Sequence, residues 1–159
     1  LDVRTAHGPV VLAFVDAGIR EGRRLLVGLK ERAGEFRRAG AHNYAHPNPE
    51  IRAGRAPSTR AGTTVAVVVR AAAIDQVREL QRELELPFYV LWDEGGRISE
   101  SWGVGDAGIV VAVVEEGNKI TRVSPPGKLP AAEEILHSIR PPAGVHPEPP
   151  AEPSTSRPD

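Results

Sequence analysis

Residues 9–15 read Pro9-Val-Val-Leu-Ala-Phe-Val15, and this unbroken apolar run ends at the turn Asp16-Ala-Gly18. A short run of strand-forming residues without polar alternation predicts a strand that is buried on both faces. The run Thr63-Thr-Val-Ala-Val-Val-Val69 has the same character and predicts a second such strand. Between the two, Arg20 to Ala39 places its large apolar residues at helical spacing, which predicts an amphipathic helix.

The following residues, up to position 140, continue the alternation of strands and helices. We expect helices over residues 72–84, 97–102 and 131–139, strands over residues 86–91, 109–114 and 119–123, and a turn at Asp93-Glu-Gly-Gly96. Strand–helix–strand units give a parallel sheet, and the hairpin turn Glu116-Gly117-Asn118 adds an antiparallel strand. The expected fold is therefore α/β: a three-layer α/β/α sandwich around a mixed sheet, with a C-terminal β-hairpin and a covering helix.

Two segments lack this periodicity. Residues 41–62 are rich in Pro, Gly, Asn and Arg, and we interpret them as an irregular inserted loop, because structureless stretches of this length are uncommon inside a domain unless they have a function. Residues 141–159 contain 7 prolines and almost no large apolar side chain, which predicts a disordered tail. The expected domain spans residues 1–140.

Composition excludes several classes of function. The chain has 159 residues and a net charge of −1, so a strongly basic nucleic-acid binder is not expected. It has no apolar run long enough to span a bilayer, and its first residues do not resemble a signal peptide. The sequence contains no cysteine, which excludes a thiolate nucleophile, a disulfide and a zinc site built on sulfur. We expect no cofactor.

Five motifs, in their order and spacing, resemble those of peroxiredoxins of the alkyl hydroperoxide reductase type. They are Gly8-Pro-Val-Val-Leu-Ala-Phe14, Phe36-Arg-Arg-Ala-Gly-Ala41, Glu83-Leu-Glu-Leu-Pro-Phe88 with Leu91-Trp-Asp93, Ser101-Trp-Gly-Val104, and Pro125-Pro-Gly-Lys-Leu-Pro130. The resemblance covers residues 8–140 apart from 41–62. It implies a thioredoxin-like fold.

The catalytic residues of that family are missing from the matching positions. The family's Pro-x-x-x-Thr-x-x-Cys motif falls on Asp16, Arg20 and, depending on the direction of counting, Gly22 or Arg23. Its activating arginine falls near Gly108. Because peroxide reduction requires an attacking thiolate, the resemblance implies a degenerate member of the family that is not an enzyme.

The remaining candidate sites are clusters of charged or polar residues. Arg20, Arg23 and Arg24 could bind an anion near the former active site, although a solvated helix face is the simpler interpretation. His42 and His46 have a spacing that binds metals on helices, but the neighbouring prolines favour polar loop residues, and we expect no metal. In the same loop, we expect contacts with a partner through Tyr44, His46, Arg52 and Arg55.

These observations favour a redox-inactive, peroxiredoxin-like domain that acts as a structural or interaction protein, as an accessory subunit of a larger complex. Other protein subunits would bind the loop 41–62 and the tail 141–159, and a homodimer is also consistent with the family. Two alternatives are binding of an anionic small molecule in the vacated pocket and a role as a maturation chaperone of a metalloenzyme. We expect a cytoplasmic protein, either free or peripheral to a membrane-bound complex.

Overall fold

The computed structural model describes residues 8–40, 42–44, 58–60, 62–106, 108–115, 118–125 and 128–139, with the backbone alone for 42–44 and 58–60. Five strands form the main sheet in the order β5-β4-β1-β6-β7. Their bounds are Val10–Asp16 for β1, Thr64–Arg70 for β4, Tyr89–Asp93 for β5, Ile109–Glu115 for β6 and Lys119–Val123 for β7. The strands β1, β4 and β5 are parallel, whereas β6 and β7 run antiparallel to their neighbours. The mixed sheet and the hairpin are confirmed.

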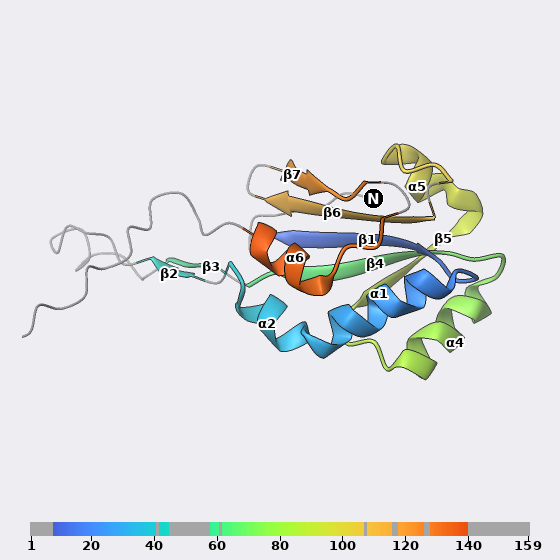
Figure 1. Cartoon of the computed structure of the whole chain (residues 1–159), viewed down its shortest axis with the longest axis horizontal. Coiled ribbons are helices and arrows are strands. Elements are labelled where there is room, and N and C mark those ends of the chain that lie inside the picture. Colours follow the sequence, from blue (N-terminus) through green and yellow to red (C-terminus); the bar gives the residue numbers. More distant parts are fainter. Residues whose placement is uncertain are drawn as a thin grey trace, which may run out of the picture.

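Helices cover both faces of this sheet. Figure 1 shows α1, α2 and α4 together along one side and α5 apart from them. The bounds are Arg20–Glu31 for α1, Ala33–Arg38 for α2, Ile74–Leu84 for α4, Arg97–Ser101 for α5 and Ala132–Ser138 for α6. The larger core contains residues of α1, α2, α4 and α6, and the smaller core lies under α5. The three-layer arrangement predicted from the sequence is therefore confirmed.

Strand alternation separates the two cores. Odd-numbered positions of β1 and β4 face the larger core, where Val11 and Val67 have no exposed surface. Even-numbered positions of the same strands, such as Phe14 and Val68, face the smaller core. The Phe14 and Trp102 rings lie 6.0 Å apart between centroids, so Trp102, which directly follows α5, packs against the sheet.

The single helix predicted over residues 20–39 is wrong, because the chain breaks it into α1 and α2 at Arg32. The backbone of Arg32 leaves the helical region, with φ −103° and ψ 15°. Its guanidinium binds the carboxylate of Glu35 at 3.1 Å. Gly34, in the first turn after the break, lowers the intrinsic preference for a continuous helix.

The expectation of irregular backbone throughout residues 41–62 is also wrong at its two ends. His42–Tyr44 forms β2 and Ser58–Arg60 forms β3, and the two pair antiparallel. The reason lies beside them: Thr63 donates its backbone N–H and its hydroxyl to the carbonyl of Ala39, at 2.9 and 2.8 Å. The chain therefore leaves and re-enters the domain at one place, so the two ends of the insertion run side by side.

Candidate functional site

Three charged residues form a row across the carboxyl ends of the parallel strands. In the sheet register Asp16 lies opposite Arg70, and Arg70 lies opposite Asp93. Each is the last residue of its strand. Alternation directs all three side chains to the face that carries α5. An acid–base–acid row thus marks this end of the sheet.

Asp93 is fully buried and holds the start of α5. One carboxylate oxygen accepts the backbone N–H of Ile98 at 2.7 Å. The other accepts the backbone N–H of Ser99 at 3.0 Å and its hydroxyl at 2.5 Å. Burial alone would raise the pKa of Asp93, but the hydrogen bonds from Ser99 and Ile98 and the charge of Arg70 outweigh it and lower the pKa below its ordinary value.

Arg70 connects this end of the sheet to the loop that precedes β6. Its guanidinium donates to the carbonyl of Gly105 and to the carboxylate of Asp106, both at 2.6 Å. Gly96 lies directly against the guanidinium, since a Cβ placed there would be 3.1 Å from Nη2. The side chain is 28% exposed, so this arginine is both a structural clamp and part of the surface.

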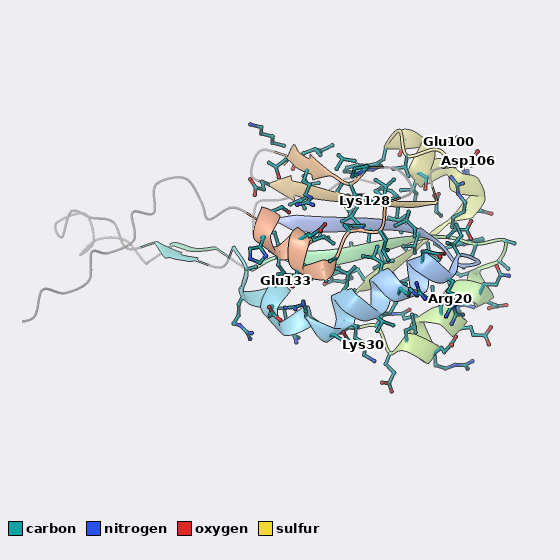
Figure 2. The ribbon with its side chains drawn as sticks, viewed as in Figure 1. Arg20, Lys30, Glu100, Asp106, Lys128 and Glu133 are labelled. Atoms are coloured by element: carbon teal, nitrogen blue, oxygen red, sulfur yellow. The ribbon has the colours of Figure 1, made fainter. Side chains whose placement is uncertain are left out.

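An open cleft of about 760 Å³ lies at the same end of the molecule. It is lined by the β1–α1 turn, the end of β4, part of α4, and residues of η1 (Glu94–Gly96), α5 and the loop before β6. Figure 2 shows two of its carboxylates, Glu100 and Asp106, at the end of the molecule where α1 begins with Arg20. The charged lining residues are Asp16, Arg23, Arg70, Glu79, Glu100 and Asp106.

The space on the other side of Arg70 is almost closed. Between the end of β1 and the loop that carries Gly105 and Gly108, the free volume is about 10 Å³, roughly enough for one water molecule. A Cβ atom at position 108 would lie 3.1 Å from Cδ1 of Ile19, so a side chain larger than that of Gly108 would be crowded there. In the described part of the chain, the room for a ligand at this edge therefore lies in the cleft beside α1 and α4.

Of the three arginines predicted to bind a ligand, only Arg23 lines the cleft. It donates to the carboxylate of Glu83 at 2.8 Å, which joins α1 to α4, and this bond and the charge of Glu83 raise the pKa of Arg23. Arg20 and Arg24 are exposed on α1 and are not among the lining residues. The structure therefore does not gather the three into one cluster.

The residues predicted to contact a partner lie outside what the structure describes in atomic detail. His46, Arg52 and Arg55 fall outside the described residues, and Tyr44 and His42 are described by their backbone alone. The tail 141–159 is also outside them. Within the described ranges, no three His, Asp or Glu side chains are grouped to hold a metal ion. No helix there is long and apolar enough to cross a membrane.

Sequence reasoning missed Arg70, Asp93 and Asp106 as parts of a site. A signal is present, because each parallel strand ends on a charged residue and the carboxyl ends of parallel strands meet at one edge. The sequence predicts only a turn at 93–96, whereas the Asp93 carboxylate binds amides five and six residues further along the chain.

Comparison with solved structures relates this fold to thioredoxin-like proteins. A secreted Mycobacterium tuberculosis disulfide oxidoreductase, described as homologous to E. coli DsbE, has a TM-score of 0.59 and 16% identity, over 82% of this chain and 79% of that chain. A DsbE-type thiol:disulfide interchange protein from Chlorobium tepidum has a TM-score of 0.61 and 15% identity, over 86% and 83%. A secreted thiol-disulfide isomerase from Corynebacterium glutamicum has a TM-score of 0.63 and 13% identity, over 82% and 68%.

The chain has the thioredoxin-like α/β fold that these structures share. At such low identity the likeness establishes the fold and not the activity. The three are described as thiol-disulfide proteins rather than peroxiredoxins, so they support the thioredoxin fold predicted from the sequence and not the peroxiredoxin subtype. No protein-family profile matches the sequence, and no curated protein matches it.

Proposed function

We propose that this chain is a redox-inactive thioredoxin-like domain that acts as an interaction protein, as an accessory subunit of a larger assembly. The observation that carries the proposal is the absence of cysteine from a chain that keeps the fold. Thiol–disulfide exchange and peroxide reduction both need an attacking thiolate. The first turn of α1 instead carries buried Gly22 and ion-paired Arg23, while the sheet and both cores are intact.

The intact packing supports a domain that is kept for binding, rather than one that has lost every function. Asp93 satisfies three donors, and none of the buried side-chain polar atoms in the described ranges lacks a hydrogen bond. A domain that keeps such a network at this edge of the sheet, without thiols, is suited to recognition rather than redox chemistry. We extend the proposal to the inserted loop 41–62 and the tail 141–159 as further partner contacts.

An anionic small molecule is the less supported occupant of the cleft. Both guanidiniums that line it, those of Arg23 and Arg70, already bind carboxylates at 2.8 and 2.6 Å. An anion would have to compete with Glu83 for Arg23 and with Asp106 for Arg70. A maturation chaperone for a metalloenzyme would also be an interaction protein, and it rests on analogy between folds.

Two assays test the redox half of the proposal. We expect the full chain to reduce neither insulin disulfides nor hydrogen peroxide faster than buffer, with dithiothreitol as the reductant. The matched control is the chain after heat denaturation, which reveals any contaminating catalyst that survives heating. A rate above buffer that is lost on denaturation would contradict the proposal.

We also propose a cytoplasmic location, in which the protein is either free or bound beside a membrane complex. Cell fractionation tests this location.

A further inference from the structure

We propose that the cleft beside α1 and α4 binds a basic segment of a protein partner, with a lysine or arginine side chain of that segment inserted among the cleft carboxylates. This inference rests on the interaction role proposed above and specifies the chemistry of the partner. It is carried by three features of the cleft: its net charge, the pairing of its two arginines, and the apolar surface in its lining.

The charge of the lining is negative. Four of the six charged lining residues carry carboxylates and two carry guanidiniums, which gives a formal sum of −2. The helices α1 and α4 begin beside the cleft, and each helix start adds about half a positive charge. The sum then remains near −1. Glu83, which pairs with Arg23, adds a further carboxylate nearby, so the cleft favours a cation.

The arginines are engaged, whereas carboxylates remain available. Arg70 binds Asp106, and Arg23 binds Glu83. The Glu100 carboxylate is exposed and makes no hydrogen bond or ion pair with any part of the chain that the structure describes. Glu79 is exposed near Arg23, whose pKa it helps to raise after the larger effects of Glu83. An entering ammonium or guanidinium can bind Glu79 or Glu100 without breaking a hydrogen bond that either carboxylate makes within the described part of the chain.

The uncharged lining suits the aliphatic part of a basic side chain. Ala71, Ala72 and Leu80 present apolar surface between the carboxylates. Lysine and arginine bury their methylene stems on apolar surface while the charged end reaches polar groups. A volume of about 760 Å³ with an open mouth admits such a side chain together with neighbouring residues of an extended segment.

The test measures peptide binding by fluorescence anisotropy at physiological salt. The probes are a labelled octa-arginine peptide and a labelled octa-glutamate peptide, added to the full chain and to Glu79→Gln, Glu100→Gln and the double variant. Glu31→Gln is the matched control, because Glu31 is exposed at the far end of α1, about 12 Å along the helix from Arg23. Circular dichroism confirms that each variant is folded.

We expect saturable binding of octa-arginine and none of octa-glutamate. Each cleft variant should weaken binding about two- to fivefold, which is the effect of one exposed ion pair, and the double variant by about the product of the two. Glu31→Gln should bind as the parent does. Equal binding by all variants, no octa-arginine binding, or preference for octa-glutamate would overturn the inference.

The same variants separate this inference from the proposed function. If the native complex forms and survives Glu79→Gln and Glu100→Gln unchanged, the interaction role stands and the cleft is not the basic-segment site. If the native chain has no protein partner, the proposed function fails irrespective of the peptide result.

Discussion

Arg70 and Asp93 lie opposite each other at the ends of β4 and β5, where the arginine charge helps to keep a fully buried carboxylate ionised. The pair joins the ends of these two strands to two neighbouring segments. Asp93 binds the start of α5, and Arg70 binds the loop before β6. The edge is therefore held together by side chains that have no redox chemistry.

Removing the buried carboxylate should destabilise the fold. Asp93→Ala leaves the N–H groups of Ile98 and Ser99 without their acceptor and removes a negative charge beside Arg70. We expect the free energy of unfolding to fall by roughly 3 kcal/mol. Urea denaturation followed by circular dichroism measures it. A loss below about 1 kcal/mol would show that Asp93 does not anchor this edge.

Acid should weaken the fold through the same residue. The folded-state pKa of Asp93 lies below its ordinary value of 3.8. Between the two values the unfolded chain binds a proton that the folded chain does not, so the contribution to stability is fully present above 3.8 and is lost as the pH falls through the folded pKa. The stability gap between the parent chain and Asp93→Asn should shrink as the pH falls below 3.8. A gap that is constant over this range would contradict the assignment.

Arg70→Ala should release the loop before β6. The variant loses the bonds to Gly105 and Asp106, and we expect faster hydrogen exchange at residues 103–106 with a loss of roughly 1–3 kcal/mol in stability. Arg97→Ala is the control, because Arg97 is 75% exposed and pairs with Glu94 three residues earlier. Equal exchange in the two variants would remove Arg70 as the clamp.

Two glycines of α1 should respond to alanine with opposite sign. A Cβ at Gly22 would lie 3.3 Å from both the carbonyl of Asp16 and Cβ of Val15, which are fixed in β1. We expect Gly22→Ala to cost about 1 kcal/mol or more, despite the higher helix propensity of alanine. At Gly28 the Cβ would lie 3.8 Å from Ala132, an ordinary contact, so Gly28→Ala should gain about 0.5–1 kcal/mol. Thermal unfolding measures whether each substitution raises or lowers the stability. A stabilising Gly22→Ala would show that α1 is not closely packed on β1.

The elements are predictable because their signals are local. Runs such as Val65–Val69 and the apolar stripe of α1 are recognised within one segment, and their burial follows from composition. The row of Asp16, Arg70 and Asp93 was not predicted, because it exists only once β1 lies beside β4 and β4 beside β5. Those pairings depend on contacts between residues far apart in the chain.

The cleft illustrates the same limit. The sequence points to Arg23 because the resemblance to peroxiredoxins puts that family's active-site motif at this position. The structure does bring Arg23 to the cleft, but its partner Glu83 lies 60 positions away in the sequence. Sequence spacing therefore indicates free arginines on the α1 face, whereas packing of α1 against α4 pairs Arg23 and leaves carboxylates exposed.

The most direct test of the central claim is the native mass and composition of the particle that contains this chain. The particle would be purified from its source under mild conditions. Size exclusion with light scattering would give its mass, and mass spectrometry would identify the co-eluting chains. We predict a particle well above the 17.1 kDa of this chain, with foreign subunits in fixed stoichiometry. Elution of the chain alone, as a monomer or a homodimer, would contradict the account.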